Sequence, residues 1–381
     1  MKNFSGKMSK GTAPASGMVV RMKTDKTEMR TLEAAANDFP GYRPSYPVDL
    51  HTHSTRSDGA DTPQQLIDHA AALGMNIIAI TDHDIRPPKE IPVETAIAGN
   101  STEMKKTDAG GSILVDAVDY ARSKGLHLLR GIEISCETTA EDCHLVCLGC
   151  DWEDPFFDDL EGAVVESKIG SYRELVRRLN ADGMRMTWEE VLENGGNPVS
   201  EEQVQKKMIF ELIARKGYQK DWSSAKLMVK NTPAYQVLRE KPDPVEVIRQ
   251  IHRCGGIVIM AHPYLINEPV SIPSGTMDRS TYIDRLIEAG LDGIEACYPY
   301  SKTSYGGSLT PEQIENEVRE RYAGRIAIIS GGSDYHADFR KGVSPEKARI
   351  IGESGITLEY FQQNTLLQEV LRKNMPNTDL V

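Results

Sequence analysis

The chain has 381 residues and a formal net charge of −12, with 44 lysines and arginines against 56 aspartates and glutamates. Its hydrophobic content of 39% supports a substantial folded core and excludes wholesale disorder. The negative charge opposes a surface that binds nucleic acid or an anionic membrane over the whole molecule, but it is compatible with one local basic pocket for a small phosphorylated ligand.

The sequence has no apolar run of about 18 residues, so we expect no membrane-spanning segment. The basic N-terminus lacks the apolar stretch of a signal peptide, which predicts a cytoplasmic protein with reduced cysteines. Cys143, Cys147 and Cys150 stand close to His144 and suggest a zinc site. On a strand, however, Cys143 and Cys147 point away from His144, so we do not predict one.

Residues 1–45 have little apolar periodicity and end in several prolines, which predicts an N-terminal arm. From Val48 onward, short apolar runs alternate with segments of helical period, which predicts βαβ units and a parallel sheet. The expected strands are 48–53, 76–81, 128–134, 144–148, 256–261, 293–297 and 326–330. The expected helices between them are 63–73, 113–123, 244–252, 281–289 and 311–322. Seven strands suit a (β/α) barrel better than an open doubly wound sheet, which stays an alternative.

Two insertions interrupt this alternation. Residues 152–243 have helical periodicity at 172–182, 188–192, 206–216 and 224–229. A structureless loop of that length is not expected in a compact domain, so we predict a helical insertion. Residues 86–111 carry proline and glycine without a clear period, which predicts a long loop over the mouth of the barrel. The predicted parts are therefore an arm at 1–45, a barrel at 46–151 and 244–360, the helical insertion at 152–243, and a C-terminal helix and tail at 361–381.

Six of the nine histidines stand at the ends of expected strands: His51, His53, His83, His144, His262 and His336. Glu133 and Asp334 place carboxylates at corresponding positions. In a parallel barrel the carboxyl ends of the strands meet at one face, and residues two apart on a strand point to the same side. Imidazole with carboxylate suits Zn, Mn or Fe, so the pattern predicts a metal centre. The other three histidines, His69, His127 and His252, are expected to be structural or surface residues.

These motifs resemble those of the PHP (polymerase and histidinol phosphatase) family. In order they are His51-Thr-His53-Ser-Thr-Arg-Ser-Asp58-Gly, Thr81-Asp-His83-Asp, Gly131-Ile-Glu133-Ile-Ser, Ala261-His262-Pro and Gly332-Ser-Asp334-Tyr-His336. The resemblance runs from about Val48 to Ala337. It implies an α/β fold, a distorted (β/α)7 barrel with an inserted, mostly helical subdomain, and phosphoesterase activity on two or three Mn, Fe or Zn ions.

The resemblance also implies how the ligands are shared among the ions. One ion would be held by His51, His53, Glu133 and Asp334. A second would be held by Glu133, His144 and His262, with Glu133 bridging the two. A third would be held by Asp58, His83 and His336, although an ordinary Ser-Asp-Gly turn is the alternative interpretation of Asp58.

For catalysis we expect three residues to act: Glu133 as the bridging ligand, and Asp58 or His262 as the source of the proton that a leaving alkoxide needs. Asp82 is expected to orient the neighbouring imidazole of His83.

Five cations after strands or in the insertion are candidates for positioning a phosphate ester: Arg56, Arg86, Lys206, Arg239 and Lys302. Where small-molecule phosphatases of the family carry Arg-Pro-His-Ile, this chain has Lys206-Lys-Met208-Ile. We therefore expect a metal-dependent phosphoesterase that hydrolyses a small phosphorylated metabolite, such as a nucleotide, a bisphosphate or a cyclic phosphate, by metal-activated water. The alternatives are a metal amidohydrolase that cleaves C–N bonds, and a nuclease or proofreading module, which the charge of −12 opposes.

Overall fold

The computed structural model describes residues 41–94, 112–140 and 142–374. Most of the predicted N-terminal arm, the middle of the predicted mouth loop and the end of the predicted tail lie outside these ranges. No helix in the described ranges combines the length and the apolar character needed to cross a bilayer.

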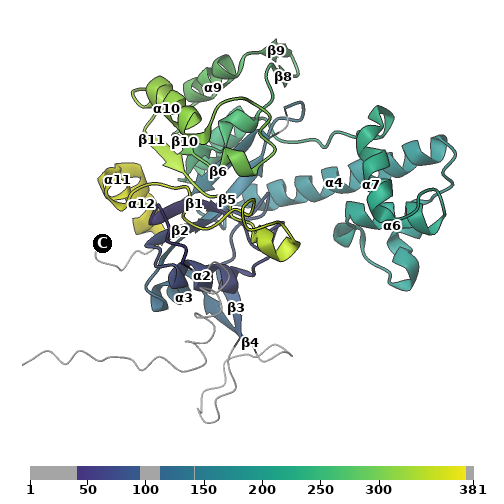
Figure 1. The fold of residues 1–381 in the computed structure, drawn as a ribbon, viewed down its shortest axis with the longest axis horizontal. Coiled ribbons are helices and arrows are strands. Elements are labelled where there is room, and N and C mark those ends of the chain that lie inside the picture. Colours follow the sequence, from purple (N-terminus) through teal and green to yellow (C-terminus); the bar gives the residue numbers. More distant parts are fainter. Residues whose placement is uncertain (1–40, 95–111, 141, 375–381) are drawn as a thin grey trace, which may run out of the picture.

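A seven-stranded sheet of order β1-β2-β5-β6-β7-β10-β11 forms the centre of the molecule (Figure 1). Its strands are β1 (Val48–Thr52), β2 (Ile77–Ile80), β5 (His127–Ser135), β6 (His144–Leu148), β7 (Ile257–Met260), β10 (Gly293–Cys297) and β11 (Ile328–Gly331). The two edge strands nearly meet, because Thr52 forms a parallel bridge with Tyr335. Asp49 strengthens this closure by accepting hydrogen bonds from the amide (3.0 Å) and the hydroxyl (2.5 Å) of Ser333. The predicted distorted barrel is therefore confirmed, and all seven predicted strands are present.

One strand departs from the expected parallel arrangement. β6 runs antiparallel to both of its neighbours, β5 and β7. The connection from β5 to β6 is short, and a short connection can join only antiparallel strands, since a parallel pair needs a long crossover. As a consequence, the first residue of β6, His144, pairs with Ser135 at the carboxyl end of β5. The start of β6 therefore lies at the same face as the ends of the other strands.

Helices cover the outside of the barrel: α2 (Pro63–Ala72), α3 (Ala117–Ser123), α8 (Pro244–Arg253), α9 (Arg279–Glu288), α10 (Pro311–Tyr322), α11 (Leu358–Gln363) and α12 (Thr365–Asn374). Three of them begin with a capping side chain followed by proline, which satisfies free amide groups and fixes the first helical φ angle: Thr62-Pro63, Asp243-Pro244 and Thr310-Pro311. Their apolar faces join the core of the sheet. Ile248 of α8 and Tyr282 of α9, for example, pack in one cluster with Ile294 of β10.

Two antiparallel pairs of short strands were not expected. β3 (Glu90–Glu94) pairs antiparallel with β4 (Ser112–Asp116), and β8 (Val270–Ile272) pairs with β9 (Gly275–Met277). The predicted loop at 86–111 is therefore wrong where β3 forms. The predicted helix at 113–123 is wrong in its first residues, which belong to β4. The helix α3 begins only at Ala117, because the Asp116 side chain caps it by accepting from the amides of Val118 and Asp119.

The insertion is helical, as predicted, and it extends away from the barrel along α4 (Pro155–Ala181) (Figure 1). The shorter helices α5 (Trp188–Glu193), α6 (Lys206–Arg215) and α7 (Trp222–Asn231) pack around the far end of α4. We call this far part, residues 172–237, the helical lobe. It has an apolar core of its own, in which Leu179 of α4 packs with Ile213 of α6 and Val229 of α7. The sequence predicted only the final third of α4, because few residues of its first half are buried.

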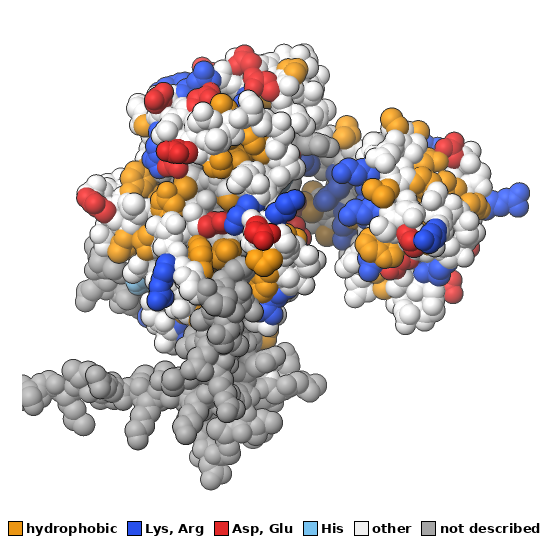
Figure 2. Space-filling model, in the orientation of Figure 1, with side chains coloured by type: hydrophobic (Ala, Val, Ile, Leu, Met, Phe, Trp, Pro, Cys, Tyr) orange, Lys and Arg blue, Asp and Glu red, His pale blue; other side chains and the backbone are white. Residues whose placement is uncertain are grey.

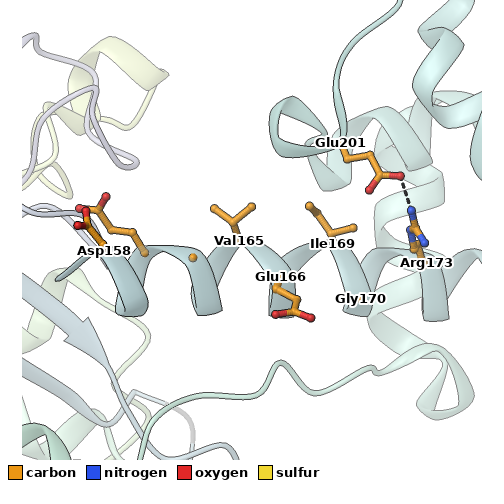
Figure 3. A pocket seen from close by; sticks show the side chains of 9 residues that line it. Asp158, Val165, Glu166, Ile169, Gly170, Arg173 and Glu201 are labelled. Carbon is orange, nitrogen blue, oxygen red and sulfur yellow. Dashed lines mark hydrogen bonds and ion pairs between the residues drawn. The ribbon is translucent and has the colours of Figure 1, made fainter. Parts of the chain in front are cut away.

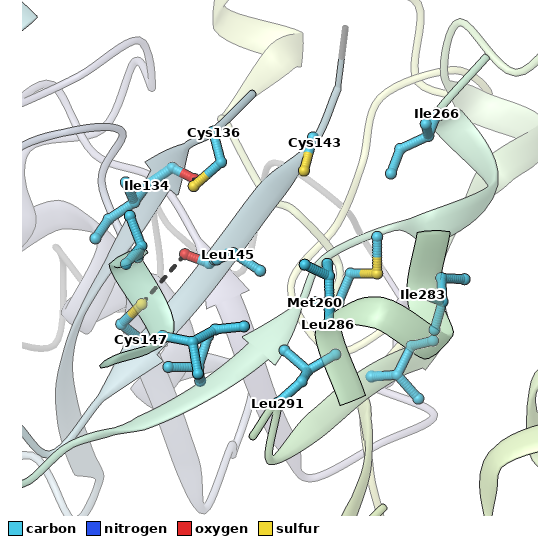
Figure 4. Close-up of a cluster of buried hydrophobic side chains, with 14 of the residues drawn as sticks. Ile134, Cys136, Cys143, Leu145, Cys147, Met260, Ile266, Ile283, Leu286 and Leu291 are labelled. Carbon is cyan, nitrogen blue, oxygen red and sulfur yellow. Dashed lines mark hydrogen bonds between the residues drawn. The ribbon is translucent and has the colours of Figure 1, made fainter. Parts of the chain in front are cut away.

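The cysteines near His144 lie in the main hydrophobic core (Figure 4). Cys143, Cys147 and Cys150 are all buried free thiols. Burial raises the pKa of Cys143 to about 12, while its contact with the hydroxyl of Tyr282 at 3.1 Å acts in the opposite direction. These thiols are therefore protonated and pack as apolar side chains.

Candidate metal centre

Glu133, near the end of β5, is the centre of the site. Its carboxylate is fully buried, with an exposed fraction of 0%. The oxygen Oε2 lies 3.2 Å from Nε2 of His51, 3.2 Å from Nε2 of His53 and 3.0 Å from Nδ1 of His83. The oxygen Oε1 lies 3.0 Å from Nδ1 of His144 and 3.1 Å from Nε2 of His262. The two oxygens of one carboxylate thus divide the surrounding imidazoles into two sets.

Asp334 and His336 follow β11 and face this centre. Oδ1 of Asp334 lies 3.1 Å from Nε2 of His53 and 3.6 Å from Nε2 of His51. Nε2 of His336 lies 2.9 Å from Oδ1 of Asp58, in the loop after β1. The nine predicted ligands are therefore brought together at one face of the barrel.

The side-chain atoms form three overlapping groups that could hold a metal ion. They are His51, His53, Glu133 and Asp334; His83, Glu133 and His144; and His53, Asp58, His83 and His336. The first group has the same members as the first predicted set. The second contains His83 where the prediction has His262, although the His262 imidazole contacts the same Glu133 oxygen as His144. The third adds His53 to the predicted residues.

The donor atoms suit bound cations. Several buried ligand atoms lie close to other ligand atoms but make no well-aligned hydrogen bond: Nε2 of His51, both ring nitrogens of His53, Nδ1 of His83, Nδ1 of His262 and Oε2 of Glu133. Buried polar atoms normally have partners, so such a concentration of unpaired donors in one place needs an explanation. Divalent ions among these lone pairs would provide it, and the residues present therefore fit metal ions.

In this centre, the carboxylates and imidazoles shift one another's pKa values and offset the effect of burial. Burial raises the pKa of Glu133, but His83, His51 and His144 outweigh burial and hold the pKa well below its ordinary value. Burial lowers the pKa of His51, whereas the carboxylates of Glu133, Glu295 and Asp334 raise it well above its ordinary value. The buried carboxylates thus require positive charge beside them, which metal ions would also supply.

Three further residues support this centre and were missed by the sequence analysis. Oδ2 of Asp334 accepts a hydrogen bond of 2.7 Å from the hydroxyl of Tyr298, and the Arg349 guanidinium binds the same oxygen. The buried carboxylate of Glu295 lies 3.3 Å from Nδ1 of His51. Glu295 had a signal in the sequence, because it is a single charged residue within an apolar strand. Arg349 had none, since it comes from a loop without a motif.

Asp82 does not have the role that we expected. Its carboxylate accepts hydrogen bonds from the amide (2.8 Å) and the hydroxyl (2.7 Å) of Ser54, and from the hydroxyl of Ser57 (2.7 Å). Neighbouring residues of an extended segment point to opposite sides, so Asp82 faces away from the His83 imidazole. It therefore holds the loop that leads to Asp58.

The five candidate substrate cations lie in different places. Arg86 is engaged by Asp158 and Glu161 of α4, and Nζ of Lys302 binds Glu353 and the carbonyl of Ala348. The exposed Arg56 donates to the carbonyl of Arg86 at 3.2 Å. In the described part of the chain, Lys206 and Arg239 have no carboxylate within ion-pairing distance. Contact with substrate stays a prediction for all five.

A groove of about 660 Å³ runs along α4, between the barrel and the helical lobe (Figure 3). Its lining includes the acids Asp158, Glu161, Glu166 and Glu201 together with Val165 and Ile169. None of its lining residues belongs to the metal centre, and its acidic character disfavours a phosphate ligand.

The nearly closed barrel and the imidazoles and carboxylates at its strand ends place the protein among α/β barrels with a candidate metal centre. The chain matches the model of the PHP domain family over residues 49–231. It is 26% identical over 295 residues to the phosphoribosyl 1,2-cyclic phosphate 1,2-diphosphodiesterase of Eggerthella lenta, covering 76% of this chain and 94% of that protein. It is 27% identical over 298 residues to the 3',5'-nucleoside bisphosphate phosphatase of Chromobacterium violaceum, covering 76% and 87%.

The fold is also similar to a solved structure from Bifidobacterium adolescentis that is named as a metal-dependent phosphoesterase. The TM-score is 0.54, with 24% sequence identity, over 86% of this chain and 98% of that one. This likeness supports the assignment of the fold.

Proposed function

We propose that the protein is a cytoplasmic metal-dependent phosphoesterase that hydrolyses a small phosphorylated metabolite, such as a nucleotide, a bisphosphate or a cyclic phosphate. The observation that carries this proposal is the sharing of Glu133 between two sets of imidazoles at one barrel face. Relatives that match over most of their length are named for such substrates. The six free thiols fit the reducing conditions of a cytoplasm.

We assign the metal ligands as the nine residues His51, His53, Asp58, His83, Glu133, His144, His262, Asp334 and His336. Their nitrogen and oxygen donors, without thiolate, favour two or three ions of Mn, Fe or Zn. Such ions, when bound, lower the pKa of a coordinated water and neutralise charge on phosphoryl oxygens.

The chain's own residues have distinct tasks in this proposal. Glu133 keeps the two imidazole sets at a fixed separation, because one carboxylate contacts both. Asp58 and His262 are our candidates for delivering a proton to the leaving oxygen. The Asp58 carboxylate is the more accessible of the two, with a side chain 60% exposed against 4% for His262.

Cations in the helical lobe and next to it support a substrate that carries a second anionic group. Burial lowers the pKa of Lys206, and the positive charge of Arg239 lowers it further. Burial and Arg239 also lower the pKa of Lys168, at the middle of α4. These cations repel one another, and in the described residues no carboxylate pairs with Lys206 or Arg239 to offset the repulsion. Figure 2 shows lysine and arginine side chains on the side of the lobe nearest the barrel. A phosphate bound there would relieve the repulsion.

The proposal is tested with protein purified in the presence of Mn²⁺. Bound metal is measured by mass spectrometry, and turnover is measured on a panel of mono-, bis- and cyclic phosphates beside a panel of amides and other C–N substrates. We expect two or three ions per chain and phosphate release, with the highest kcat/KM on a substrate with two phosphates. Turnover of C–N substrates without any phosphate release would refute the phosphoesterase and favour the amidohydrolase.

A further inference from the structure

The carboxylate of Glu295 contacts two proposed metal ligands that come from different strands. It lies in β10, and its exposed fraction is only 2%. Oε1 of its carboxylate lies 3.3 Å from Nδ1 of His51 at the end of β1. Oε2 accepts a hydrogen bond of 2.8 Å from the backbone amide of His262 after β7. One buried carboxylate therefore contacts a proposed ligand of the first set and a proposed ligand of the second.

The contact with His51 determines which ring nitrogen faces the centre. An ionised carboxylate only accepts hydrogen bonds, so Nδ1 of His51 must carry the ring proton. When the ring carries only this proton, the lone pair is on Nε2, the nitrogen that lies 3.2 Å from Glu133 and 3.6 Å from Asp334. A His51 with its proton on Nε2 would present a donor to the centre and could not bind a cation there.

The contact with His262 fixes an unusual backbone. His262 has φ +26° and ψ +57°, in the left-handed region that a residue with a side chain seldom adopts. The amide that donates to Glu295 belongs to this same residue. The carboxylate thus holds the backbone in the conformation that brings Nε2 of His262 to 3.1 Å from Glu133.

The packing around Glu295 leaves it little freedom. A Cβ atom at Gly332, after β11, would lie 2.3 Å from Cβ of His51 and 3.0 Å from Oε1 of Glu295. Only glycine therefore allows β11 to approach both residues so closely. This packing keeps the carboxylate directed at His51 and His262.

We propose that Glu295 is a positioning residue that sets the tautomer of His51 and the backbone of His262, so that ion binding by the first and second ligand sets depends on it. The inference rests on the metal centre of the proposed function. Hydrogen-bonded carboxylates behind metal-binding histidines are known to control ligand orientation and metal affinity.

The decisive variant is Glu295→Gln, which keeps the size of the side chain and removes one acceptor. If the amide NH₂ faces His51, Nδ1 must accept and the ring proton moves to Nε2. If it faces His262, two donors oppose each other. We expect Mn²⁺ affinity to fall by roughly 10- to 100-fold, measured by calorimetry on metal-stripped protein without substrate. Near-UV circular dichroism should stay the same as in the wild type.

Two further variants separate positioning from general stability. Glu295→Asp keeps both acceptors on a shorter side chain, so its affinity should lie between those of the wild type and Glu295→Gln. Asp68→Asn is the matched control, because Asp68 is a buried carboxylate of α2 that accepts from the hydroxyl of Tyr120 at 2.8 Å, away from the proposed ligands. It should bind Mn²⁺ as the wild type does.

A readout on the metal-free protein keeps this inference separable from the proposed function. Long-range proton–nitrogen NMR spectra of ¹⁵N-histidine-labelled protein, recorded at a pH high enough for the His51 ring to carry a single proton, report the His51 tautomer, with His51→Asn providing the assignment. We expect the proton on Nδ1 in the wild type. In Glu295→Gln we expect its loss from Nδ1 if the amide NH₂ faces His51, and a kept tautomer with reduced Mn²⁺ affinity if the NH₂ faces His262. An unchanged tautomer with unchanged Mn²⁺ affinity would overturn the role of Glu295. A wild type that binds no metal would refute the metal centre, while the tautomer measurement would still decide whether Glu295 orients His51.

Discussion

The guanidinium of Arg86 and the carboxylate of Glu161 join the loop after β2 to the helix α4. Nε of Arg86 donates to Oε1 of Glu161 at 3.0 Å, and the Arg86 amide donates to the same oxygen at 2.8 Å. Arg86 follows the proposed ligand His83 by three positions in the sequence. The pair therefore connects the metal centre to the helix that carries the helical lobe.

A double-mutant cycle on this pair distinguishes two roles for Arg86. If Arg86 maintains the placement of α4, Arg86→Ala and Glu161→Gln should raise KM to a similar extent, and the double variant should be no worse than either one. We expect this result, with an interaction free energy of roughly 0.5–3 kcal/mol. A rise in KM for Arg86→Ala alone, with Glu161→Gln unaffected, would instead show direct contact between Arg86 and substrate.

Glu133→Gln tests the bridging carboxylate. The amide keeps the shape of the side chain but removes the negative charge that contacts both imidazole sets. We expect bound metal and phosphoesterase activity to fall by more than about 100-fold. Replacing a residue that only hydrogen-bonds a metal ligand usually costs about 10- to 100-fold. Circular dichroism should show the wild-type fold. Wild-type turnover in this variant would refute the bridging role.

Much of the barrel could be predicted because its signals are local. The seven strands are short and rich in apolar residues, as their buried faces require. The direction of β6 could not be predicted in the same way, since an apolar run does not indicate whether its strand runs parallel or antiparallel to its neighbours. The antiparallel pair β3–β4 was missed because its strands are separated by residues 95–111, so that their pairing is not local.

The candidate site, too, could be predicted only in part. The histidines were found because each stands at a strand end, where barrel geometry makes positions that are distant in sequence converge. Their grouping around the two oxygens of Glu133 depends on side-chain orientation, which the sequence pattern does not contain. Arg349 reaches Asp334 from a loop with no periodicity, and such contacts follow only from the folded arrangement.

Asp58→Asn tests whether the third ligand group binds an ion. Asp58 contacts His336 but neither oxygen of Glu133, and it is the most exposed of the proposed ligands in that group. We expect one ion fewer per chain by mass spectrometry, with the ions at Glu133 retained. His51→Ala provides the contrast and should reduce binding at the first group. Wild-type metal content in Asp58→Asn would favour the interpretation of Asp58 as an ordinary turn residue.

Lys206→Ala tests the cations of the helical lobe, and Lys207→Ala is its matched control. Lys207 has an acid partner, Glu211, at 3.6 Å, and its ammonium lies 5.2 Å from the ring centroid of Trp222. Lys206 has neither contact, and burial, with a further contribution from Arg239, lowers its pKa. Both variants remove one positive charge from adjacent positions, so they change the long-range field by similar amounts.

For Lys206→Ala we expect KM to rise roughly tenfold on a substrate with two phosphates, because a hydrogen bond to a charged group contributes about 1.5–3 kcal/mol. On a monophosphate, KM should change little, and kcat should stay the same on both, since Lys206 is proposed to bind the second phosphate away from the reacting one. Lys207→Ala should leave all of these values near those of the wild type. Equal increases in KM for the two variants would mean that the lobe attracts substrate by its overall charge and that Lys206 makes no specific contact.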